Sequence, residues 1–164
     1  YSLLLEGSLR VLECNDITLV SLAYGVNECR AASIELNRYD ISAEVIDIRS
    51  LQPIDHKSII DSVDKTGRLI VVDHAEITCG ISSEIIVRVA VEGRKNLAIR
   101  PFRLTFPSFP CPTSHALTKD YYIAAVDIVL AALKLSGREY DYKPPHQPDD
   151  FNHDQPNPAY FGPF

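Results

Sequence analysis

"KTGRLIVVDHAEITCGISSEI", residues 65–85, is the stretch that most strongly decides the fold. Gly67 closes the segment before it, as glycine often does just past the end of a helix. Residues 68–73 then form a short apolar run that is typical of a buried strand, and residues 81–92 have the pattern of a helix. A helix, a buried strand and a second helix in succession predict part of a parallel sheet with helices on both faces.

The same alternation of strands and helices extends in both directions from this stretch. Further strands are predicted at 17–23, 43–48 and 102–106, and further helices at 26–37, 55–63 and 119–135. Asp55 is suited to cap the helix that it precedes. Short connections between alternating strands and helices favour βαβ units. The expected fold class is therefore α/β, with a three-layer, mostly parallel open sheet that has helices on both faces.

Composition limits the kinds of protein that this chain can be. Its 164 residues, 46% of them hydrophobic, are enough for one packed domain. A net charge of -6 argues against nucleic acid as a partner, because phosphate binding needs a basic face. No apolar run approaches the length of a membrane span, and the N-terminus lacks the features of a signal peptide. The chain begins at Tyr1 rather than at Met, which suggests a fragment or a processed product.

The cysteines suggest where the protein works. Cys14, Cys29, Cys79 and Cys111 form no CxxC pair, and the chain is neither small nor rich in loops. We expect free thiols, and hence a reducing compartment inside the cell, either the cytoplasm or the mitochondrial matrix.

The composition changes after Gly137, and we therefore predict an α/β domain at 1–137 and a tail at 138–164. The tail holds more than half of the chain's eleven prolines, which cannot sustain a helix interior or a central strand. It also carries several aromatic residues, among them Phe164 at its end. Aromatic residues favour a segment that lies along a surface of this chain or of a partner; a freely flexible tail is the alternative.

A group of reactive side chains stands at the end of the strand in the opening stretch. Asp73, His74, Glu76 and Cys79 lie where ligands bind in open parallel sheets, and a helix N-terminus near Cys79 would lower its thiol pKa. Their spacing matches no standard zinc site, and no glycine-rich phosphate loop accompanies them. A polar strand end that contacts another domain or subunit is the favoured interpretation, and a small independent enzyme using Asp73, His74 and Cys79 is the alternative.

Two further features are candidates for an interface. Asp47 and Arg49 lie on one side of a strand end, where they form either a local ion pair or part of a contact surface. Residues 106–114 contain three prolines, Pro110 and Pro112 among them, and must form a rigid, extended loop. Such a loop suits a docking surface, or it simply connects a strand to a helix.

Four stretches together resemble a known family. They are "ITLVSLAYG" (17–25), "AEVIDIRSLQPID" (43–55), the opening stretch and "FPCPTSHALTKDYYI" (109–123). In this order and at these intervals they resemble the C-terminal domain of the transketolase superfamily. They are most like the beta subunit of thiamine-diphosphate-dependent 2-oxoacid dehydrogenases of the pyruvate, branched-chain or acetoin type. The resemblance covers about residues 6–135, and the family commonly has Gly-Gly where this chain has Cys79-Gly80.

The resemblance implies a role in assembly rather than in catalysis. In that family an upstream pyrimidine-binding domain and the alpha subunit provide the thiamine diphosphate and magnesium sites. This chain alone is therefore expected to bind no cofactor or metal and to carry no catalytic residue. It would contact the alpha subunit, a second beta subunit and the acyltransferase core of the complex. The residues expected at such interfaces are Arg49, Asp73, His74, Glu76, Pro110, Pro112 and Phe164.

Two other functions remain open from the sequence. One is a stand-alone, non-catalytic binding module that shares the fold. The other is the C-terminal domain of a transketolase or of a deoxyxylulose-phosphate synthase.

Overall fold

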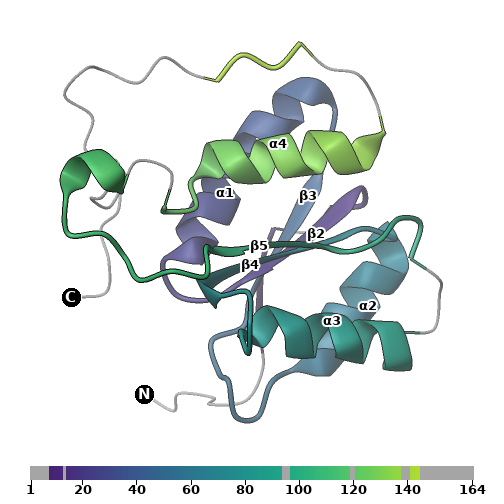
Figure 1. Cartoon of the computed structure of the whole chain (residues 1–164). Helices are drawn as coiled ribbons and strands as arrows, with labels where there is room; N and C mark the ends of the chain where they lie inside the picture. Colours follow the sequence, from purple (N-terminus) through teal and green to yellow (C-terminus); the bar gives the residue numbers. More distant parts are fainter. Residues whose placement is uncertain (1–7, 13, 94–96, 119–120, 138–140, 145–164) are drawn as a thin grey trace, which may run out of the picture.

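The computed structural model describes residues 8–12, 14–93, 97–118, 121–137 and 141–144. These residues form an α/β fold with one mixed sheet (Figure 1). The strands are β1 (Leu9–Leu12), β2 (Ile17–Ser21), β3 (Ala43–Asp47), β4 (Leu69–Glu76) and β5 (Phe102–Phe106). The helices are α1 (Gly25–Leu36), α2 (His56–Thr66), α3 (Ile81–Glu92) and α4 (Ala125–Ser136), with 3-10 turns η1 (Asn37–Tyr39) and η2 (His115–Leu117).

The sheet has the strand order β1-β3-β2-β4-β5. The strands β2 to β5 are all parallel to their neighbours, whereas β1 pairs antiparallel with β3 at one edge. The predicted mostly parallel sheet is therefore confirmed. No local sequence pattern indicates β1, because three of its four residues are exposed and it lacks a buried apolar run.

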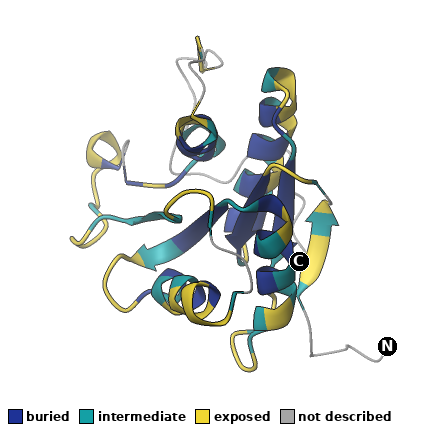
Figure 2. Ribbon diagram, turned by 90° about the vertical axis from the view of Figure 1, so that its right-hand side faces the viewer, coloured by how far each residue is buried: buried dark blue, intermediate teal, exposed yellow. Residues whose placement is uncertain are grey.

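Helices cover both faces of the sheet, as predicted. Figure 1 shows α1 and α4 on one face and α2 and α3 on the other. Alternate residues of β4 enter the two cores: Ile70 and Val72 pack against α1 and α4, and Val71 packs on the opposite side. Figure 2 shows that the buried residues concentrate in the central strands and on the inner faces of the helices.

The helix limits agree with the predictions except at the end of α2, which continues three residues beyond residue 63 to Thr66, and at the start of α4. Asp55 accepts a hydrogen bond from the N–H of Ser58 at 3.0 Å and caps α2, and Gly67 ends that helix at a φ of 71°. The last helix begins at Ala125, not at residue 119. Asp127 accepts a hydrogen bond from the N–H of Ala124 at 2.9 Å, which fixes the helix start there.

Two strand ends also differ from the predictions. The second strand ends at Ser21 rather than at residue 23, because Ala23 has a φ of 49°. The fourth strand continues to Glu76, three residues beyond its predicted end. Asp73, His74 and Glu76 are therefore part of β4 and do not follow it.

A buried carboxylate connects the antiparallel edge strand to the rest of the fold. Glu44 of β3 is fully buried, and its side chain bonds to Lys65 of α2. Arg10 of β1 lies 3.4 Å from Glu44 when measured from Nε to Oε1. Both basic side chains are about a third exposed, so they join the buried acid to the surface.

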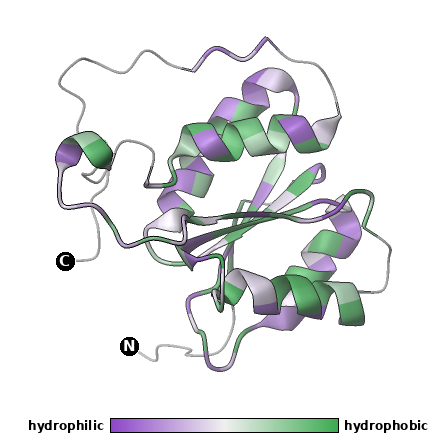
Figure 3. Cartoon of the chain, in the orientation of Figure 1, coloured by the Kyte–Doolittle hydropathy of each residue, from purple (hydrophilic) through white to green (hydrophobic). Residues whose placement is uncertain are grey.

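Hydropathy distinguishes the helices, as Figure 3 shows. The helices α3 and α4 are more hydrophobic than α1 and α2, but Val87 and Val91 on α3 remain exposed. Within the described ranges, no helix combines the length and apolar character that a membrane crossing requires.

The tail is described only at 141–144, where it has no regular secondary structure. Tyr142 is partly buried and packs against the core cluster to which α1 and α4 contribute. Its ring contacts that of Tyr39 edge-on, with the ring centroids 5.8 Å apart. This part of the tail therefore lies on the chain's own surface, one of the two predicted locations. The proposed domain limit at Gly137 stays a prediction.

Candidate functional site

A cavity opens at the carboxyl ends of β2 and β4. Its volume is about 510 Å³. The lining residues come from the loop after β2, the loop after β3, the end of β4 and the start of α3: Leu22, Ala23, Tyr24, Leu51, Asp73, His74, Ala75, Cys79, Gly80, Ile81 and Glu84. The connection from β2 leads to β3 on one side, and the connection from the adjacent β4 leads to β5 on the other, so the chain reverses direction between β2 and β4. This is the point where ligands bind in open α/β sheets.

Asp73 has a structural role at this cavity. Its side chain is only 3% exposed, and Oδ2 accepts a hydrogen bond from the N–H of Ser82 at 2.9 Å. Ser82 lies in the first turn of α3, so Asp73 caps that helix from the neighbouring strand. The structure therefore places Asp73 inside the domain rather than on its surface.

Gly80 makes this arrangement sterically possible. A Cβ atom at Gly80 would lie 2.6 Å from Oδ2 of Asp73 and 2.6 Å from the carbonyl oxygen of Glu76. Neither distance is compatible with a side chain, because both contacts are far inside van der Waals range. This accounts physically for a glycine at the second position of Cys79-Gly80.

His74, one of the lining residues of the cavity, lies between aromatic rings. Its ring stacks on Phe106 of β5 at a centroid distance of 5.2 Å and an interplanar angle of 8°, and Tyr24 lies 6.2 Å away. The Nε2 atom is buried and has no hydrogen-bond partner among the described residues. Burial lowers the pKa of His74 below its usual value, although Glu28 and Asp73 act in the opposite direction.

Backbone strain is concentrated at the same edge of the sheet. Ala23, Arg49 and Cys79 follow β2, β3 and β4 in turn, and each has a φ between 49° and 61°. This region favours glycine, and other residues adopt it at a cost in conformational energy. Cys79 is exposed and stands directly before Gly80. Its positive φ explains why glycine would suit the position that Cys79 occupies.

The other predicted interface residues lie apart from the cavity wall. Arg49 forms the predicted local ion pair, with Nε 3.6 Å from Oδ2 of Asp47. Glu76 is exposed at the end of β4. Pro110 is exposed and Pro112 half-buried in the loop after β5, and Phe164 lies outside the described residues. Whether any of these residues contacts a partner stays a prediction.

The reactive residues do not assemble into a catalytic group. His74 and Cys79 both line the cavity, but no hydrogen bond joins them. In the part of the chain that the structure describes, no three His, Cys, Asp or Glu side chains are grouped so as to hold a metal ion. All four cysteines are free, in agreement with the prediction.

An aromatic cluster continues from His74 onto the surface, and no local sequence pattern predicts it. Phe106 contacts Tyr121 at 4.9 Å and Tyr122 at 5.8 Å, and Phe109 lies 5.7 Å from Tyr121. The Sγ atom of Cys111 lies 3.1 Å from the hydroxyl of Tyr122. Phe106 ends β5, whereas Tyr121 and Tyr122 stand at the far end of the loop that connects β5 to α4. They come together because this loop folds back onto the end of β5.

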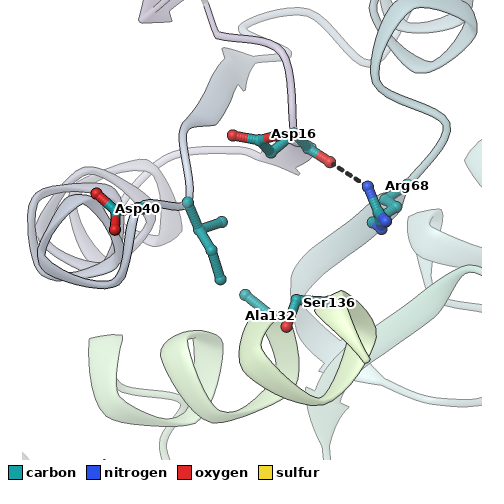
Figure 4. Close-up of a pocket in the computed structure, with 6 residues that line it drawn as sticks. Asp16, Asp40, Arg68, Ala132 and Ser136 are labelled. Atoms are coloured by element: carbon teal, nitrogen blue, oxygen red, sulfur yellow. Dashed lines mark hydrogen bonds between the residues drawn. The ribbon is translucent and has the colours of Figure 1, made fainter. Parts of the chain in front are cut away.

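A small hollow lies at the opposite edge of the sheet, as Figure 4 shows. Its volume is about 40 Å³, enough for about one water molecule. Nη1 of Arg68 donates to the carbonyl oxygen of Asp16 at 3.3 Å across it. Asp40 and Ser136 also line this hollow, which is too small for an organic ligand.

The fold and this site define an α/β domain whose reactive side chains serve capping and packing, with an open cavity and an exposed rigid loop at one edge. Comparison with known proteins identifies the family. The family model "Transketolase, C-terminal domain" matches residues 7–128. The chain belongs to this family, and the resemblance recognised in the sequence is confirmed.

Curated relatives show which proteins carry similar domains. The chain is 38% identical over 125 residues to the beta subunit of acetoin:2,6-dichlorophenolindophenol oxidoreductase of Bacillus subtilis strain 168, and the match covers 76% of this chain and 36% of the relative. The corresponding subunit of Cupriavidus necator is 33% identical, with coverages of 76% and 37%. The beta subunit of the pyruvate dehydrogenase E1 component of Bacillus subtilis is 35% identical over 104 residues, with coverages of 63% and 32%. The chain thus spans about a third of each relative.

A solved structure has the same fold. It is described as a split gene transketolase in an inactive beta4 tetramer. It matches with a TM-score of 0.69 and 25% identity, over 80% of this chain and 42% of that one.

Proposed function

We propose that this chain is the C-terminal assembly domain of a 2-oxoacid dehydrogenase beta subunit. The whole enzyme would decarboxylate a 2-oxoacid on thiamine diphosphate and magnesium and transfer the acyl group to a lipoyl arm. The relatives that are beta subunits of acetoin and pyruvate dehydrogenases support this proposal. The partners would be the alpha subunit, a second beta subunit and the acyltransferase core. The free cysteines support a reducing compartment within the cell.

One observation carries the assembly role. The loop between β5 and α4 exposes large apolar side chains, with Phe109 51% and Leu117 69% exposed. Prolines in this loop restrict its backbone, so little conformational entropy is lost when it binds. Apolar and aromatic anchors on a rigid support are typical of the centre of a protein interface.

Replacing both anchors tests the assembly role directly. The chain carrying Phe109→Ser and Leu117→Ser should associate at least about tenfold more weakly with itself or with the alpha subunit in sedimentation experiments. Its melting temperature should change little, because both side chains are exposed. Ile34→Ser is the matched control, since Ile34 is 66% exposed on the outer side of α1. Equal losses in the control and in the double variant would contradict the proposal.

The cofactor part of the proposal has its own test. The chain alone should give no binding heat with thiamine diphosphate and Mg²⁺ in calorimetry, and no decarboxylation of pyruvate or branched 2-oxoacids. The reason is that, within the described residues, no three His, Cys, Asp or Glu side chains are grouped so as to hold a metal ion, and Asp73 is committed to capping α3. Binding at micromolar affinity would contradict it.

A transketolase is the second candidate, favoured by the solved structure of similar fold. The chain would then associate with the amino-terminal part of a transketolase rather than with a dehydrogenase alpha subunit. A co-purification experiment with each of these two partners separates the candidates.

A further inference from the structure

The strand β5 is an edge strand whose outer side is unpaired within the described residues. It is last in the strand order and bonds only to β4. Pro101 and Pro107 stand directly before and after it, and its five residues contain neither proline nor glycine. A regular strand that presents unpaired N–H and C=O groups is a template for pairing with a further strand.

The strand at the other edge of the sheet, β1, is protected in ways that β5 is not. It has only four residues, and its pairing with β3 shifts register between Arg10 and Leu12. The side chain of Arg10 is also directed to the buried Glu44. Short length, irregular register and a charged side chain all disfavour pairing at an edge. By contrast, β5 pairs with β4 in regular register from Phe102 to Thr105.

An exposed apolar side of α3 adjoins this open edge. Nη1 of Arg103 in β5 donates a hydrogen bond to Oγ of Ser83 at 2.6 Å, which places Ser83 on the side of α3 that faces β5. Val87 and Ala90 follow Ser83 by four and seven residues, so they lie on the same side of the helix. Val87 is 56% exposed, Ala90 is exposed, and the adjacent Val91 is 76% exposed.

We infer that two copies of this chain join through β5, with the two strands antiparallel and centred on Leu104, and that α3 of each copy packs beside α3 of the other. A two-fold axis at Leu104 sets Phe102 opposite Phe106 of the second copy. Arg103 then lies opposite Thr105, so no like charges face each other. Each pair joins residues of the same two-residue period, so the unpaired backbone groups of both copies meet.

The charges beside this edge are balanced. On α3, Nε of Arg88 lies 2.8 Å from Oε1 of Glu84, and Nη1 of Arg88 lies 2.7 Å from Oε1 of Glu92. Arg103 adds a second positive charge, and it bonds to α3 of its own copy. Two acidic and two basic side chains sum to zero. These groups therefore do not repel a second copy, although the whole chain has a net charge of -6.

A second copy covers both exposed features at once. An isolated extended peptide that adds a strand to β5 would leave Val87 and Ala90 of α3 exposed. A partner that carries a helix beside its own edge strand covers the strand and the helix together, and this chain has that arrangement. A surface that complements itself about a two-fold axis is what a closed dimer requires.

Sedimentation and hydrogen exchange of the full chain test the inference. The chain should show an equilibrium between monomer and dimer with a Kd of about 1–10 μM. In the dimer, the β5 amides that do not bond to β4 should exchange at least about tenfold more slowly than in the monomer. These amides belong to alternate residues of the strand, so protection should appear with a period of two.

A substitution on α3 tests the helix contact. Val87→Arg places a charge in that contact and should weaken dimerisation at least about tenfold, while folding is preserved because Val87 is largely exposed. Ile34→Arg is the matched control, since Ile34 is 66% exposed on α1. The control should change the Kd by less than about twofold.

Two substitutions at Thr105 test the register. Opposite Arg103 of the second copy, Thr105→Glu should tighten the dimer about two- to tenfold, and Thr105→Lys should weaken it by a similar factor. Their effects on folding run in the other direction, because Thr105 is the neighbour of Asp73 in β4. Glutamate beside Asp73 should lower the melting temperature and lysine should not, so the two measurements separate folding from association.

Four results would overturn the inference. They are a chain that stays monomeric up to about 500 μM, equal effects of Val87→Arg and Ile34→Arg, a dimer whose β5 amides exchange as fast as in the monomer, and a dimer weakened by Thr105→Glu and tightened by Thr105→Lys.

The inference deepens the proposed function, because it assigns the contact with a second beta subunit to β5 and α3. The two can still fail separately. A chain that dimerises through β5 but does not bind a dehydrogenase alpha subunit would count against the proposed function alone. A monomeric chain that binds the alpha subunit would count against this inference alone.

Discussion

At the scale of single residues, the backbone conformation at Cys79 matters more than its thiol. Its φ of 61° is costly for any residue with a Cβ atom. We expect Cys79→Gly to stabilise the fold by about 0.5–1 kcal/mol, since relief of strain exceeds the added freedom of glycine in the unfolded chain. Urea unfolding measures the change. Cys111→Gly is the control, because Cys111 is equally exposed but is not left-handed, and its substitution should not stabilise the fold.

The imidazole of His74 makes stability depend on pH. Burial lowers its pKa in the folded state below 6.5, so the unfolded chain takes up a proton at higher pH than the folded chain does. The free energy of unfolding should therefore fall as the pH decreases from 6.5 towards the folded pKa. In His74→Phe this dependence should disappear between pH 7 and 5.

The carboxylate of Asp55 titrates in a separate pH range, which serves as an internal control. Hydrogen bonds from Ser58 and Ser8 hold the pKa of Asp55 at about 2, against the opposing effect of burial. Its contribution is therefore lost only below pH 4, as the pH falls towards 2. When the free energy of unfolding is plotted against pH, the parent chain and His74→Phe should diverge near pH 6 and run parallel near pH 3. Identical slopes near pH 6 would show that His74 is not responsible.

At the scale of elements, the edge strand β1 depends on a buried acid. Glu44→Ala should destabilise the fold by about 3 kcal/mol, because it removes the group that joins Arg10 and Lys65 across β3. Hydrogen exchange of the β1 amides should accelerate more than that of β2. Glu84→Ala is the control, since its pair with Arg88 is exposed and the change should stay within about 0.5 kcal/mol. Equal effects would contradict a special role for Glu44.

The elements themselves show what local pattern can and cannot predict. The strands β2 to β5 and the buried stripe of α1 follow from apolar runs and helical spacing, which are properties of neighbouring residues. The strand β1 depends instead on a distant partner, β3, and the true start of α4 depends on Glu28 of α1, whose Oε2 accepts a hydrogen bond from the N–H of Ala125 at 2.8 Å. In the site, the position of Asp73 was predictable, but its role as a cap of α3 was not, because nine residues separate Asp73 from Ser82.

At the scale of the whole molecule, the two edges of the sheet are built differently. At the amino edge Arg68 and Asp16 close the surface around a water-sized hollow. At the carboxyl edge three left-handed residues, a large cavity and the exposed proline-rich loop occur together. Strain of this kind persists where the surrounding structure imposes it, and it tends to cluster at functional sites. We therefore expect a contact surface of the domain at the carboxyl edge.

Part of the tail packs on the folded domain. Tyr142 contacts Tyr39 edge-on and packs on the core beneath α1 and α4, so part of residues 138–164 contributes to the folded domain. Truncation after Gly137 should lower the free energy of unfolding by about 1–2 kcal/mol, and Tyr142→Ala should reproduce most of that loss. Tyr122→Ala is the matched control from the aromatic cluster on the other side of the molecule. If truncation weakens assembly while leaving the melting temperature unchanged, the tail serves a partner instead, and the contact between Tyr142 and Tyr39 contributes nothing to folding.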